Sequence, residues 1–96
     1  MKKYAYPASF MPARKHSYTI EFPDFPYCSS FGKDLEEAKL MAEEALSLNL
    51  FCMLEAKEKL PRPTPLKHLE VGKGAIVAMV ECCPELCRDR VERIVV

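Results

Sequence analysis

Acidic side chains are the first groups in this chain of 96 residues that could carry out chemistry. A metal-dependent nuclease needs carboxylates that converge on one pocket from several strands. The spacing here favours a solvated helix face instead, because four of the glutamates share the polar side of one predicted helix. A minimal nuclease is kept as one alternative. The carboxylates concerned are Glu21, Asp24, Glu36, Glu37, Glu43 and Glu44.

Cysteine and histidine could bind a metal or supply a nucleophile, but their spacing supports neither role. Cys82, Cys83 and Cys87 lack the Cys-x-x-Cys pairing that is usual in structural zinc sites, which need four ligands. His16 and His68 fall in polar segments, and no Ser or Cys forms a nucleophile motif with them. Five cysteines, an odd number, suit reduced thiols. We expect no metal, no cofactor and no enzymatic activity.

Length and charge restrict the organisation and the partners of the chain. Ninety-six residues predict a single domain over 1–96, without a separate DNA-binding domain. The formal net charge is zero, with 14 basic and 14 acidic residues, so we expect no nucleic-acid binding by this chain alone. No segment reaches the roughly 18 apolar residues of a membrane helix. We therefore expect a cytoplasmic protein without membrane contact.

Three strands are predicted in the first third of the chain. Residues 3–10 form the first, and Pro7 within it must avoid a ladder donor position, which indicates a sheet edge or a bulge. Residues 17–22 form the second, with Tyr18, Ile20 and Phe22 on one face. Residues 28–31 could form a short third strand. Asp34 and Glu37 then make a capping box that opens a long helix over about 35–56.

The predicted helix has an apolar stripe that widens toward its end. Ala42 and Ala45 are small enough to allow close approach to a sheet. In the second half, Leu50, Phe51 and Leu54 interrupt the polar side. Either the segment 60–72 folds back over them or they form a protein interface, and the second alternative makes these three residues candidates for a homodimer contact.

The last third of the chain alternates extended segments with turns. Residues 61–65 contain three prolines and predict an extended connector. A turn follows at 72–74, and the continuous apolar run 75–80 is typical of a buried central strand reached by a crossover. Pro84 ends it, and 90–96 predicts a further short strand.

The segment Phe22-Pro23-Asp24-Phe25-Pro26-Tyr27-Cys28 closes the second strand and precedes the capped helix. Together with the elements around it, this segment resembles the N-terminal domain of HicB-type antitoxins, which has an aromatic strand, a similar turn, a glycine, and a Glu-Glu-Ala helix ending in a proline-rich loop. Tyr27 departs from that pattern, because the family usually has glycine there. The matching residues are Tyr4, Pro7, Phe10, Tyr18, Phe22, Pro23, Asp24, Pro26, Cys28, Gly32, Glu36, Glu37, Ala38, Ala42, Ala45, Leu46, Pro61 and Pro63.

The resemblance implies an α+β fold: a sheet of three or four strands with one long helix on one face, in the order β-β-β-α-β, partly like ribonuclease H. It also implies an antitoxin that sterically blocks a small HicA-type toxin, which cleaves RNA. Asp24 and Tyr27 are our candidates for that contact, because the turn carries a charge and an aromatic ring. Family members continue into a DNA-binding module near residue 90, and we expect no such module in this chain. A solitary HicB-like module that oligomerises or senses a ligand is therefore an alternative.

Overall fold

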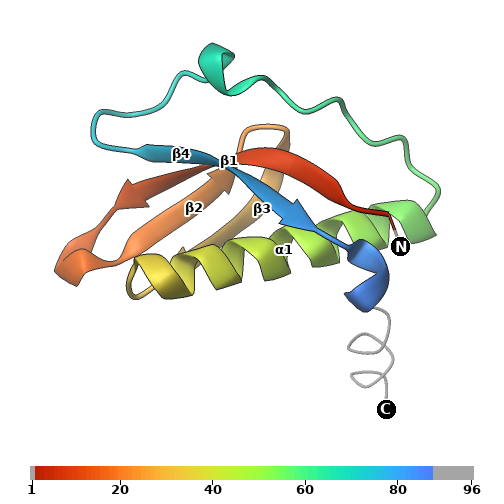
Figure 1. Ribbon diagram of the computed structural model, residues 1–96, viewed down its shortest axis with the longest axis horizontal. Helices are drawn as coiled ribbons and strands as arrows, with labels where there is room; N and C mark the ends of the chain where they lie inside the picture. The colour runs from red at the N-terminus through yellow and green to blue at the C-terminus, as the bar shows by residue number, and fades with distance from the viewer. Residues whose placement is uncertain (1, 88–96) are drawn as a thin grey trace.

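The computed structural model describes residues 2–87 of the chain. The strand predicted over 90–96 lies outside these residues. Four strands form one antiparallel sheet in the order β3-β2-β1-β4: β1 spans Tyr4–Pro12, β2 Tyr18–Phe22, β3 Phe25–Gly32 and β4 Ile76–Cys82 (Figure 1). Together with the single long helix α1, Leu35–Glu55, they confirm the predicted α+β fold.

The helix begins where the capping residues predict. Asp34 Oδ1 accepts a hydrogen bond from the Glu37 amide at 2.8 Å, which satisfies one of the unpaired donors of the first turn. The Glu37 carboxylate accepts a second bond from the Lys33 amide at 3.0 Å. Just before this cap, a Cβ on Gly32 would come within 2.4 Å of the Ala38 backbone. Glycine therefore lets the helix cross close to β3.

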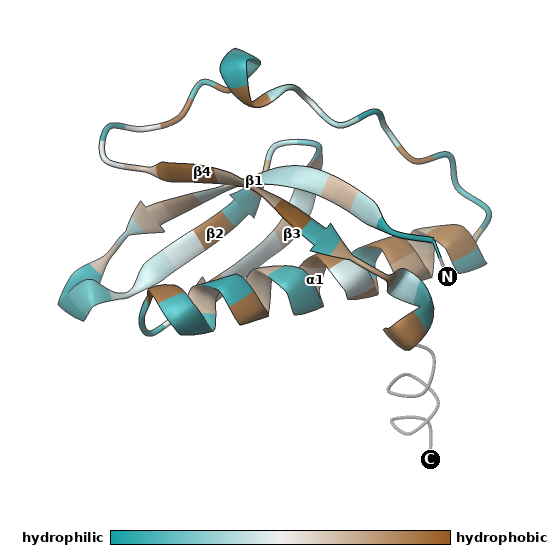
Figure 2. Ribbon diagram, viewed as in Figure 1, coloured by the Kyte–Doolittle hydropathy of each residue, from teal (hydrophilic) through white to brown (hydrophobic). Residues whose placement is uncertain are grey.

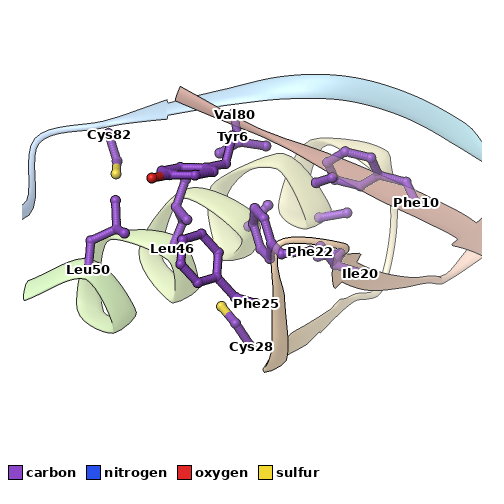
Figure 3. Close-up of a cluster of buried hydrophobic side chains, with 13 residues drawn as sticks. Tyr6, Phe10, Ile20, Phe22, Phe25, Cys28, Leu46, Leu50, Val80 and Cys82 are labelled. Atoms are coloured by element: carbon purple, nitrogen blue, oxygen red, sulfur yellow. The ribbon is translucent and has the colours of Figure 1, made fainter. Parts of the chain in front are cut away.

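The core lies between α1 and the sheet face that it covers (Figure 3). Ala38, Ala42, Leu46 and Leu50 are fully buried on the helix. They meet aromatic side chains of the strands, among which the Tyr6 and Phe25 rings pack edge to face with centroids 4.6 Å apart. Figure 2 shows the corresponding mixture of hydrophobic and hydrophilic residues along α1. The strand residues in the core are Tyr6, Ala8, Phe10, Ile20, Phe22, Phe25, Cys28, Val80 and Cys82.

The prediction that 75–80 forms a central strand is wrong. Within residues 2–87, β4 pairs with β1 alone and stands at one end of the sheet order. Ala78 and Val80 contribute to the core side, whereas Ile76 and Met79 are 41% and 43% exposed. A continuous apolar run indicates a strand, but it does not determine how many neighbours that strand has.

The prediction that Pro7 lies at a sheet edge or a bulge holds locally, although β1 as a whole is an inner strand. Pro7 is paired with Met79 of β4, but the β1–β2 ladder covers only Ser9–Pro12. The missing amide donor of proline is therefore tolerated where β2 no longer runs beside β1. The side chain of Pro7 is fully buried.

The end of α1 is covered in part by the chain itself. Leu60, just after the helix, packs against the core, and the Tyr6 hydroxyl donates to the Pro61 carbonyl at 2.6 Å. Leu50 is fully buried and contributes to the core, so the homodimer role predicted for it is wrong. Phe51 is also buried, whereas Leu54 is 39% exposed. A dimer contact by Phe51 and Leu54 stays a prediction.

Candidate partner-binding surface

The β2–β3 hairpin contains an irregularity that displays Tyr27. Phe22 pairs with Phe25, and the next pair along is Glu21 with Ser29. Pro26, Tyr27 and Cys28 therefore have no counterparts on β2, which is a bulge of β3. Pro26 has no amide donor to lose there. The side chain of Tyr27 is fully exposed, so the bulge presents an aromatic ring that no other part of the described chain covers.

Asp24, at the tip of the same hairpin, holds a distant segment. Its Oδ2 accepts from the Thr64 amide at 2.9 Å, and its Oδ1 accepts from the Thr64 hydroxyl at 2.6 Å. These bonds link two segments that lie 40 positions apart in the chain. Hydrogen bonds to a carboxylate are stronger than neutral ones, so this pair fixes the connector against the hairpin.

The hydrogen bond from Tyr6 to Pro61 is the second attachment of the connector. Burial raises the pKa of the Tyr6 hydroxyl, and the charge of Asp24 raises it further. The hydroxyl therefore remains protonated and able to donate at neutral pH. Sequence reasoning missed both attachments. One signal was available, since in 61–65 only Arg62 and Thr64 have amide donors, and a buried donor requires a partner.

The connector between α1 and β4 runs on the side of the sheet opposite the helix (Figure 1). It includes a short helical turn, η2, at Leu66–His68. Residues 70–72 and the outer sheet face enclose a hollow of about 600 Å³ beside the bulge. Gly72 approaches Met11 so closely that a Cβ there would lie 2.5 Å from the Met11 methyl carbon. The outer-face and hairpin residues that line the hollow include Ser9, Met11, Thr19, Glu21, Pro23 and Pro26.

Two of the cysteines, Cys28 and Cys82, are buried in the core. Burial raises the pKa of the Cys28 thiol, and Cys82 beside it raises it further. Burial also raises the pKa of Cys82, against a hydrogen bond with Ser47 that lowers it. Both thiols therefore stay protonated at neutral pH and are poor nucleophiles. Within residues 2–87, no group of three or more His, Cys, Asp or Glu side chains is arranged to hold a metal ion.

The two predicted contact residues thus have different environments. Tyr27 is free to meet a partner, whereas the Asp24 carboxylate already accepts two hydrogen bonds from Thr64. The acidic residues weighed as a nuclease site are spread over the outer sheet face, the hairpin and α1. Among the described helices, none is long and apolar enough to cross a membrane.

Comparison with known proteins identifies the family. The model of the HicB-like antitoxins of bacterial toxin–antitoxin systems matches residues 6–96. A 14.9 kDa protein from the rep-hol intergenic region of Haemophilus phage HP1 is 44% identical over 51 residues, which are 53% of this chain and 38% of that protein. Antitoxin HicB 1 of Photorhabdus laumondii is 35% identical over 66 residues, 69% of this chain and 43% of that antitoxin.

The fold agrees with this match. A chain of a toxin–antitoxin complex from Streptococcus pneumoniae superposes with a TM-score of 0.80 at 23% identity, covering 88% of this chain and 72% of that one. This chain therefore belongs to the HicB-like antitoxin family. Its matches span less than half the length of the two curated relatives.

Proposed function

We propose that this chain binds a small HicA-type toxin that cleaves RNA, and neutralises it by covering its active surface. The observation that carries the proposal is the family match over residues 6–96. The resemblance of the fold to a chain of a solved toxin–antitoxin complex supports it. In this proposal the chain acts by binding, through the surface around the bulge of β3.

The bulge of β3 is the contact that we propose on this chain. Exposed aromatic rings are enriched among the residues that dominate binding energy at protein interfaces. Tyr27 contributes nothing to the core, so the fold does not explain its size. HicB-type antitoxins usually have glycine at this position. The tyrosine of this chain would therefore add a contact that is specific to its own toxin. The hollow beside Pro26 could receive a side chain of the toxin.

Copurification with the product of the neighbouring gene, joined to a growth assay, tests the proposal. Wild type should bind the toxin and restore growth of cells that express it. Tyr27→Ala should weaken binding at least tenfold without changing the melting temperature, because the ring is fully exposed. Phe31→Ala is the matched control, since Phe31 is another exposed aromatic residue of β3, 52% exposed, outside the bulge.

Three outcomes would each contradict a different part of the proposal. Failure of wild type to bind the toxin would remove the antitoxin function and favour the solitary module. Normal binding by Tyr27→Ala, with loss in Phe31→Ala, would retain the function and move the contact away from the bulge. Magnesium-dependent RNA cleavage by the chain alone would instead support the nuclease alternative.

A further inference from the structure

The two edges of the sheet differ in how they are protected. The β3 edge carries Pro26 and the three-residue bulge, and it ends beside Lys33. Prolines, bulges and lysines are the usual devices that keep an edge strand from pairing with another chain. β4 has none of them: it pairs regularly with β1 over all seven of its residues, Ile76–Cys82. Within the described part of the chain, the β3 edge is therefore protected and the β4 edge is available.

The open side of β4 is apolar. Its first five residues carry no charge, and Figure 2 shows the start of the strand as hydrophobic. Ile76 and Met79 are 41% and 43% exposed, although they point to opposite faces of the sheet. Among residues 2–87, β1 is the sole strand that pairs with β4. Figure 1 shows β4 next to β1, at the end of the sheet order opposite to β3.

A hollow of about 520 Å³ follows this edge. It is lined from the core face by Ala78, from the outer face by Met79, and from α1 by Lys39 and Glu43. Because residues of both faces of β4 line one hollow, the hollow reaches around the edge of the strand. The backbone groups that point away from β1 are therefore accessible to an added strand.

We propose that β4 pairs antiparallel with β4 of a second copy of this chain, which joins two sheets of four strands into one. Seven residues give a ladder of roughly 23 Å. A two-fold axis near Met79, the middle residue of β4, places Ile76 of each copy beside Cys82 of the other. The ladder would cover the exposed apolar side chains and supply partners for the free backbone groups.

The charges of α1 favour a second copy over an unrelated strand. A two-fold axis through the middle of β4 puts both helices on the same face, running antiparallel on either side of the axis. Lys39 and Glu43 lie one helical turn apart at the hollow. The symmetry therefore brings Lys39 of each copy toward Glu43 of the other. The surface is complementary to itself, as a two-fold interface requires.

Sedimentation equilibrium on the chain alone, up to about 100 μM, tests this proposal. Wild type should form a dimer. Met79→Lys should raise the dimer dissociation constant at least tenfold, because one substitution places two like charges near the axis. The comparison variant is Leu54→Lys, which adds the same charge at a residue of similar exposure, 39%, in the rival dimer contact predicted at the far end of α1. It should leave the dissociation constant unchanged.

A second test exchanges charges on α1, so that the result does not depend on whether Met79→Lys folds normally. Lys39→Glu and Glu43→Lys should each weaken the dimer, and the double variant should restore it, because both residues are exposed and only their sign is exchanged. A chain that remains monomeric at 100 μM would overturn the proposal. So would a dimer that Leu54→Lys separates and Met79→Lys does not, or one whose charge variants show no restoration. A monomer whose Met79→Lys variant loses toxin binding would assign the edge to the toxin instead.

Discussion

At the scale of single residues, Asp24 shows how one carboxylate can serve the fold while it lies on an exposed hairpin. Its two oxygens accept from the amide and the hydroxyl of Thr64, so the partner residue offers two donors in a fixed geometry. Threonine is well suited here because Pro63 and Pro65 on either side have no amide donor. The pair positions the connector near the bulge that carries Tyr27.

Loss of this pair should reduce stability more than loss of an ordinary surface contact. Asp24→Asn removes the charge and one acceptor, and should lower the free energy of unfolding by about 1–3 kcal/mol. Thr64→Val removes only the hydroxyl bond and should cost about 1 kcal/mol. Thr19→Val, on an exposed threonine of β2, is the control and should stay within about 0.5 kcal/mol of wild type in urea unfolding.

The same variants separate the two roles considered for Asp24. If the carboxylate only fixes the connector, Asp24→Asn and Thr64→Val should affect toxin binding in proportion to their effects on stability. Weaker toxin binding by Asp24→Asn alone would show that the carboxylate also contacts the toxin. Unchanged unfolding in both variants would contradict the structural role.

At the scale of elements, sequence patterns succeeded where the determining interactions are local. The Asp34 cap and the apolar stripe fix the start and the buried face of α1, because neighbouring turns of one helix create both signals. The start of β3 was placed three residues late, since Pro26 indicates a break in a strand and here occupies a bulge. The Asp24–Thr64 link was not predictable, because nothing local joins residues 40 positions apart.

The remaining differences between prediction and structure arise from contacts between residues that are far apart in the sequence. Leu50 appears on the polar side of a helical projection, yet it is fully buried, because the sheet and the segment after the helix enclose the end of α1 on more than one side. The apolar run of β4 predicted the strand correctly and its neighbours wrongly, since strand order depends on where the crossover returns. For the candidate site, the sequence indicated the turn and its exposed aromatic, but neither the hollow nor the connector beside it.

A prediction at this scale concerns the approach of α1 to the sheet. Ala42 is fully buried and Ala45 is partly buried, so Ala42→Glu should cost roughly 3–5 kcal/mol and Ala45→Glu less. A buried charge without a partner is the cause in both cases. Leu48→Glu, on the exposed side of the same helix, should leave the melting temperature nearly unchanged. Equal melting temperatures for Ala42→Glu and wild type would contradict the packing.

At the scale of the whole molecule, one thin core has to stabilise the fold. The helix covers one face of the sheet, and the connector, attached through Thr64 and Pro61, crosses the other face (Figure 1). A chain of this size buries only about 60–65% of its unfolded surface, so pairing of two copies along β4 would add to a modest stability. Such pairing leaves the bulge and its hollow at the opposite edge, where a toxin could still bind.

The balance of charge over the molecule leads to the last prediction, which is negligible affinity for duplex DNA at physiological salt. Nonspecific DNA binding depends on several phosphate contacts from lysine and arginine. The formal net charge is zero, and of the three basic residues Arg14, Lys15 and Lys33 that line one hollow, Lys33 faces the Glu37 carboxylate at 4.0 Å. Titration of labelled promoter DNA with the purified chain should show no binding below about 10 μM at 150 mM salt. A submicromolar complex that weakens steeply with added salt would contradict this, and would make the chain a DNA-binding regulator in its own right.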